Sequence, residues 1–98
     1  MRGTVVDFDE PNCELTEATL TKNMFKCKYQ QSGDVYRVEA SSRDGITYKG
    51  NWGWPDDFRN GDTLELTRFE SKNKEIVLLG MWHRSDGYEG VYLFRLYP

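Results

Sequence analysis

The feature that most constrains this chain is an alternation of apolar and polar residues with a period of two, broken at nearly even intervals by short turn sequences. Phe25, Cys27 and Tyr29, for example, alternate with polar residues. Because successive side chains of a β-strand point to opposite faces, this pattern predicts strands with one buried face. The turn sequences recur about every twelve to fifteen residues, and connections this short join antiparallel neighbours. The reversals lie near residues 32, 44, 59, 73 and 86.

The runs between these reversals predict an up-and-down meander. A twisted antiparallel sheet with one apolar face must bury that face, either by closing into a barrel or by packing two layers. A chain of 98 residues is one domain's worth. We therefore expect a single all-β domain over residues 1–98, with about six antiparallel strands in a small barrel or half-barrel. The expected strands cover residues 20–30, 35–40, 46–52, 63–67, 76–82 and 88–97.

Residues 1–17 fit the alternation less well. A short β-branched run, Thr4–Val6, is followed by several acidic residues and by Pro11. Helical spacing runs through Leu15 and Ala18, but the neighbouring threonines lower helix propensity and favour extended structure. The expectation for this region is an N-terminal arm or a short strand.

The charge and the apolar content disfavour several classes of partner. Acidic and basic residues, 16 and 13 in number, are mixed along the chain and give a net charge of −3, which gives no reason to expect a phosphate-neutralising surface for nucleic acid. The N-terminus lacks the apolar run of a signal peptide, and no segment approaches the roughly 18 apolar residues that span a bilayer. We therefore expect a cytoplasmic protein with no nucleic-acid or membrane partner. Cys13 and Cys27 are then expected to be reduced thiols, with a disulfide as the alternative.

Aromatic residues gather in one stretch, Tyr48–Phe58, which holds four rings, two glycines and a proline. Its first half is the third expected strand, where Gly50 indicates a bend or a close approach to the backbone. Its second half begins a connection, Trp54 to Gly61, that is longer than the other turns. Aromatic residues make up 14% of a chain that is only 38% hydrophobic, so the core is also expected to be rich in rings.

These rings predict a small-ligand site at the mouth of the barrel. Indole rings offer a flat stacking surface and one hydrogen-bond donor, which suits a flat or sugar-like molecule. The alternative for Trp52 and Trp82, which lie in strands, is that they belong to the core, whereas Trp54 lies at a loop entrance. The expected ligand-binding residues are Trp52, Trp54, Phe58, Trp82, His83 and Tyr88.

The last two expected strands support a second hypothesis, an interaction or self-assembly domain. Both strands are apolar on both faces, so they are covered either by the N-terminal arm or by a protein partner, including a second copy of the chain. A homodimer is the simplest such assembly. The expected interface residues are Val77, Leu79 and Met81, or Tyr92, Phe94 and Leu96.

A third hypothesis, a small hydrolase or isomerase, rests on His83, the only histidine of the chain, with Asp86 or Glu89 close in sequence. Histidine is the residue best suited to acid-base chemistry near neutral pH. One histidine without a clustered cysteine pair provides no zinc ligand set, and the acidic residues after Pro55 do not match a calcium loop. We therefore expect a non-enzymatic protein with no catalytic residue, no metal and no cofactor.

The run Gly50-Asn51-Trp52 resembles the glycine-any-tryptophan motif of the calycin group, the lipocalin-like and avidin-like barrels. The resemblance implies an up-and-down barrel, and members of that group carry small ligands inside it. In those families the motif lies on the first strand, whereas here it falls on the third expected strand. About six strands also enclose less space than a typical lipocalin cavity, so the resemblance supports the architecture alone.

Overall fold

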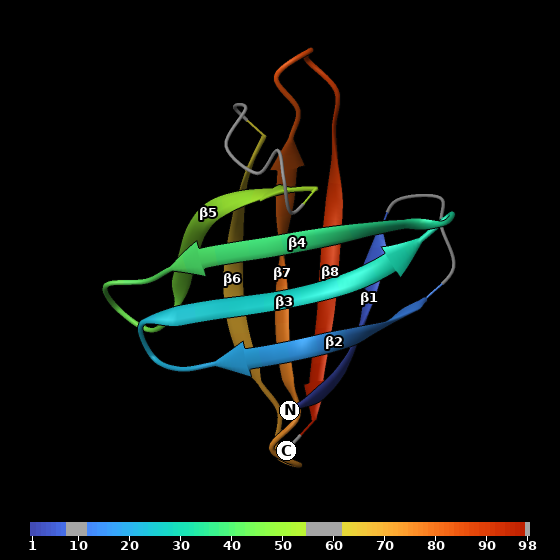
Figure 1. Ribbon diagram of the computed structural model, residues 1–98. Coiled ribbons are helices and arrows are strands. Elements are labelled where there is room, and N and C mark those ends of the chain that lie inside the picture. The colour runs from blue at the N-terminus through green and yellow to red at the C-terminus, as the bar shows by residue number, and fades with distance from the viewer. Residues whose placement is uncertain (8–11, 55–61, 98) are drawn as a thin grey trace.

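The computed structural model describes residues 1–7, 12–54 and 62–97, and these residues form a closed barrel of eight antiparallel strands (Figure 1). Each strand pairs with the next along the chain, and β8 pairs with β1 to close the barrel. The predicted all-β meander is therefore confirmed, with eight strands in place of about six. The strands are β1 (Arg2–Asp7), β2 (Cys13–Leu20), β3 (Met24–Gln31), β4 (Asp34–Ser41), β5 (Thr47–Gly53), β6 (Thr63–Glu70), β7 (Ile76–His83) and β8 (Glu89–Tyr97).

The two additional strands, β1 and β2, lie mostly in residues 1–17, for which the sequence predicted an arm or a short strand. β1 pairs with β8 from Arg2↔Tyr97 to Asp7↔Tyr92, so it belongs to the barrel wall. In β2 a register shift between Thr16 and Thr19 interrupts the pairing with β3. Because of this bulge, the buried side chains of Leu15 and Ala18 are three residues apart rather than two. A search for strict two-residue alternation therefore fails on β2.

The strands form two layers that cross at a steep angle. Figure 1 shows β2, β3 and β4 running across β6, β7 and β8, with β1 and β5 completing the wall at the sides. Among the described strands, the closed ladder leaves no edge on which another chain could add a strand. Any partner must therefore meet either a face of the wall or one end of the barrel.

The interior is filled by side chains, and rings dominate it. Five of the largest fully buried side chains are Phe25, Tyr29, Tyr48, Tyr92 and Phe94. An eight-stranded barrel has an interior just wide enough for side chains to fill. The remaining buried hydrophobic residues are Val5, Leu15, Ala18, Cys27, Val38, Ala40, Trp52, Leu64, Leu66, Leu78 and Leu96.

Gly50 and Gly80 mark places where neighbouring backbones approach too closely for a side chain. A Cβ added at Gly50 would lie 1.9 Å from the carbonyl oxygen of Glu39, and one added at Gly80 would lie 1.8 Å from that of Glu65. The close backbone approach predicted at Gly50 is confirmed. Both glycines are inside strands, where only the absence of Cβ permits so close an approach.

The described residues contain no helix long and apolar enough to cross a membrane. Cys27 carries a free thiol. Its side chain is almost completely buried in β3, and burial raises the pKa of this thiol well above its ordinary value.

Candidate binding site at the aromatic end of the barrel

Six rings meet at one end of the barrel, which we call the aromatic end. In an antiparallel meander the last residues of odd-numbered strands and the first residues of even-numbered strands lie at the same end. Here the contributors are β3, β4, β5, the residue after β5, β7 and β8. Residues far apart in sequence are brought together because the barrel is closed. The six rings are those of Tyr29, Tyr36, Trp52, Trp54, Trp82 and Tyr92.

Three of these rings form a stack that runs from the core to the surface. The centroids of Tyr29 and Tyr36 are 5.4 Å apart with an interplanar angle of 25°. Those of Tyr36 and Trp54 are 6.1 Å apart with an angle of 24°. Tyr29 is fully buried, whereas Trp54 is 49% exposed. The stack therefore ends in an indole ring at the surface of the protein.

The other three rings pack edge to face beside this stack. Trp52 lies 5.1 Å from Trp82 at 67° and 6.3 Å from Tyr92 at 89°. The indole Nε1 of Trp52 donates to the carbonyl oxygen of His83 at 3.4 Å, and the hydroxyl groups of Tyr29 and Tyr92 form a hydrogen bond. Edge-to-face pairs of this kind suit the ring quadrupoles. These rings hold the end of the barrel together.

Gly90 makes room for one of these rings. A Cβ added at this position would lie 2.5 Å from Cζ2 of Trp82. Trp82 and Gly90 are direct partners across β7 and β8. The indole therefore lies over the backbone of β8.

The structure separates the described rings among the predicted ligand-binding residues by their exposure. Trp52 is 9% exposed and belongs to the core, whereas Trp82 is partly buried and packs against the core. Trp54 and Tyr88 are exposed, at 49% and 67%. Phe58 lies outside the described residues.

Tyr88 stands apart from the stack. The guanidinium of Arg84 lies over its ring, 5.2 Å from the centroid, and no ring contact joins it to the aromatic end within the part of the chain that the structure describes. The sequence search missed Tyr29 and Tyr36 as members of the site. The alternation predicts that both side chains point inward. Which rings they stack on depends on how the neighbouring strands pair.

His83 lies next to the aromatic end on the outside of the barrel. Its Nδ1 is 2.9 Å from a carboxylate oxygen of Glu89, its direct partner on β8. Asp86, the other acidic neighbour considered, pairs instead with Arg84 at 2.7 Å. Both members of the His83–Glu89 pair are about half exposed. Within the described ranges no three metal-ligating side chains lie together.

Part of the predicted protein interface is wrong, because Tyr92, Phe94 and Leu96 are buried in the core with at most 1% exposure. β8 is apolar on both faces, so its sequence period does not tell which face points inward. The outward-facing apolar residues of β8 are Val91 and Leu93 instead. On β7, Leu79 and Met81 are exposed and Val77 is partly exposed, as expected for an outer face.

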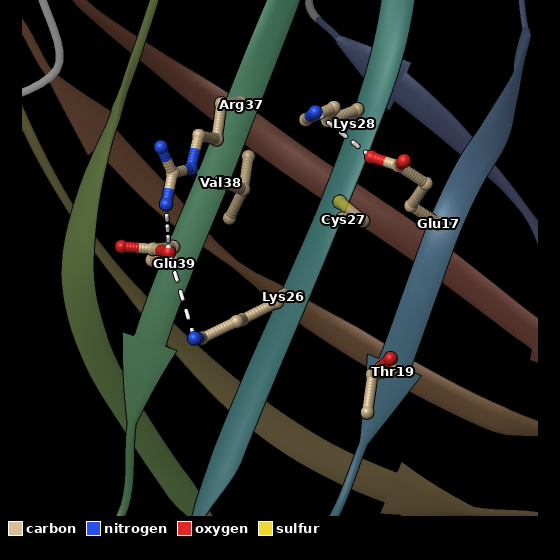
Figure 2. Close-up of a pocket in the computed structure, with 8 residues that line it drawn as sticks. All are labelled: Glu17, Thr19, Lys26, Cys27, Lys28, Arg37, Val38 and Glu39. Carbon is tan, nitrogen blue, oxygen red and sulfur yellow. Dashed lines mark hydrogen bonds and ion pairs between the residues drawn. The ribbon is translucent and has the colours of Figure 1, made fainter. Parts of the chain in front are cut away.

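A polar hollow of about 330 Å³ lies on the outside of the barrel at the bulge of β2 (Figure 2). Glu17, which has a φ of 52° at the bulge, reaches Lys28 on β3 with a distance of 2.9 Å. Glu39 on β4 lies 3.7 Å from Lys26 and also contacts Arg37. This part of the outer wall is a mixed-charge surface with cross-strand pairs. Its acidic and basic groups pair with one another, so they do not converge on a ligand.

Comparisons with protein-family models, with curated proteins and with solved structures give no match. The Gly50-Asn51-Trp52 run lies on β5, not on the first strand. The up-and-down barrel implied by its resemblance to calycins is the architecture observed. Function must therefore be argued from the geometry of the described residues.

Proposed function

We propose that this protein is a small non-enzymatic binding module that takes a flat ring, aromatic or sugar-like, at the aromatic end of the barrel. The observation that carries this proposal is the stack Tyr29–Tyr36–Trp54, which ends in a half-exposed indole. A ligand ring placed on Trp54 would extend the stack by one member.

The filled interior supports a site on the rim rather than inside the barrel. The side chains of Trp52, Tyr92 and Phe94 occupy the space below the aromatic end. A rim site that relies on one stacked ring gives modest affinity, since a stacked ring contributes about 1–3 kcal/mol. We therefore propose micromolar to millimolar binding of small planar molecules.

A binding role without catalysis agrees with the surroundings of His83. The imidazole is held by Glu89 on the solvent-exposed outside of the hairpin, and the stack ends on a different ring, Trp54. We also propose a cytoplasmic location, which the free thiol of Cys27 supports.

The test compares Trp54→Ala with Tyr88→Ala, a matched removal of an exposed ring that lies outside the stack. Binding of indole, benzoate, nicotinamide, adenosine monophosphate and cellobiose is measured by NMR chemical-shift titration. We expect at least one probe to bind the wild type and Tyr88→Ala equally, and to bind Trp54→Ala about tenfold more weakly, which corresponds to about 1.4 kcal/mol. Absence of binding by every probe, or equal binding to Trp54→Ala, would contradict the proposal.

A further inference from the structure

A second surface, separate from the aromatic end, has the character of an interface. The outward-facing side chains of β6, β7, β8 and β1 include a set of apolar residues that we call the apolar face. Phe69 is 53% exposed, Leu79 41%, Val91 40% and Met81 38%. The complete set is Val6, Phe69, Val77, Leu79, Met81, Val91 and Leu93.

The strand register makes these residues neighbours on one surface. Leu79 is the direct partner of Leu93, and Leu93 is the direct partner of Val6. Met81 lies opposite Val91, and Phe69 opposite Val77, in the rows on either side. With strands about 4.8 Å apart and two-residue steps of about 7 Å, the patch covers roughly 200–400 Å². This is about the size of the largest apolar patch on a typical monomer, a patch that is often functional.

The outer surface of the opposite wall of the barrel is charged rather than apolar. The outer face of β2, β3 and β4 carries Glu17, Lys26, Lys28, Arg37 and Glu39, which form ion pairs with one another (Figure 2). Figure 1 places these strands on the other side of the barrel from β6, β7 and β8. Val35 on β4 is also 43% exposed, but the neighbouring apolar residues gather on the wall of β6, β7, β8 and β1.

Two opposite charges border the apolar face in a symmetric arrangement around Leu79. Glu65 lies on β6 opposite Met81, two residues beyond Leu79 along β7. Arg95 lies on β8 opposite Val77, two residues before Leu79. Each charge is thus one strand and two residues away from Leu79, in opposite directions. Neither side chain forms an ion pair or a hydrogen bond with another residue that the structure describes, although Lys49 faces Glu65 across the ladder.

We propose that the apolar face binds a second copy of this chain to form a two-fold symmetric dimer. The two-fold axis lies in the plane of the interface and passes through Leu79. It runs perpendicular to the line that joins Glu65 and Arg95, so it exchanges these two positions. Each copy then presents Glu65 to the Arg95 of the other, and the apolar residues of the two faces meet between the two ion pairs. The same patch serves both subunits, as two-fold interfaces require.

The size of the face indicates how tight this dimer is. Stable interfaces bury about 800 Å² on each partner, and the apolar face with its charged border is smaller. The dimer therefore dissociates in the micromolar range or above, and the experiment must follow mass against concentration.

Sedimentation velocity on the full chain, across micromolar to millimolar concentrations, tests the proposal. We expect a reversible monomer–dimer equilibrium in the wild type. Glu65→Arg and Arg95→Glu should each weaken the dimer at least tenfold, because like charges then meet twice. The double variant Glu65→Arg/Arg95→Glu should restore the dimer, because the exchanged charges are again complementary.

Apolar substitutions and a matched control complete the test. Leu79→Lys and Val91→Lys should both give monomers with an unchanged circular dichroism spectrum. If one of the two variants folds poorly, the other still tests the proposal. The pair Lys28→Glu and Glu17→Lys, on the opposite wall, should leave the equilibrium unchanged. A wild type that stays monomeric at all concentrations, or a double variant that does not regain the dimer, would overturn the proposal and assign the face to another partner or another geometry.

Discussion

The two ends of the barrel are held by different kinds of contact. At the aromatic end, rings pack on rings, and the stack of Tyr29, Tyr36 and Trp54 ends at the surface. At the other end, which we call the capped end, one buried ring is held by polar contacts. The hydroxyl of Tyr48 donates to the carbonyl oxygen of Thr21 at 2.7 Å and accepts from the guanidinium of Arg68 at 3.5 Å.

The capped end also fixes its turns through side chains. The carboxylate of Asp44 accepts hydrogen bonds from the backbone amides of Ile46 and Thr47, both at 2.9 Å, and from the hydroxyl of Ser42 at 3.1 Å. Such bonds are typical of aspartate in turns. The hydroxyl of Tyr48 is directed to backbone groups, whereas the indole of Trp54 ends its stack half exposed. Binding is therefore proposed at the aromatic end, where a ring face is open to a ligand.

The largest expected effect comes from removing a ring within the aromatic end. Trp52→Ala should lower the free energy of unfolding by about 3–5 kcal/mol, because removal of the buried indole leaves a cavity between Trp82 and Tyr92. Trp54→Ala should cost about 1 kcal/mol or less, since half of that ring is already exposed. Urea denaturation of both variants measures the contrast. Equal costs would mean that Trp54 is a core residue, and the case for a ligand site would lose its main support.

A smaller effect is expected from the polar contacts of the capped end. Tyr48→Phe keeps the buried ring but removes the hydroxyl that bonds to Thr21 and Lys22. We expect a loss of roughly 0.5–1.5 kcal/mol, because the two carbonyl groups regain water as a partner. Tyr88→Phe, which removes the hydroxyl from a largely exposed ring, serves as the control. A Tyr48→Phe protein as stable as the wild type would show that packing alone holds the capped end.

The smallest expected effect depends on pH. Hydrogen bonds from the backbone of Thr47 and then of Ile46 lower the pKa of the Asp44 carboxyl. A carboxyl whose folded-state pKa is lowered stabilises the fold above its unfolded pKa of about 3.9, and this contribution is lost as the pH falls through the folded value.

Asp44→Asn should therefore melt at a lower temperature than the wild type at neutral pH, with a difference that narrows below about pH 4. Thermal melts followed by circular dichroism at several pH values measure this. Asp34→Asn is the control, because the Asp34 side chain has no hydrogen bond to a residue in the described ranges. A difference that stays constant with pH would show that the charge of Asp44 does not contribute.

The amino-acid sequence by itself determined the local features of this protein. The two-residue period sets which side chains of β3, β4 and β6 point inward, and the turn sequences set where the chain reverses. It also indicated a bend or a close backbone approach at Gly50. These properties depend on neighbouring residues along the chain, so they can be read without knowing the partners of each strand.

Only the tertiary structure decided the remaining features. The bulge interrupts the two-residue alternation in β2, so the sequence pattern did not identify this strand. Both faces of β8 are apolar, so only the pairing with its neighbouring strands shows that Tyr92 and Phe94 point inward. The stacking of Tyr36 on Trp54 and the placement of Glu65 and Arg95 around Leu79 depend on the register between strands. Register and closure arise from contacts between residues distant in sequence. The sequence named Trp54 and the outer face of β7, but the residues that complete the stack and the apolar face became visible only in the folded barrel.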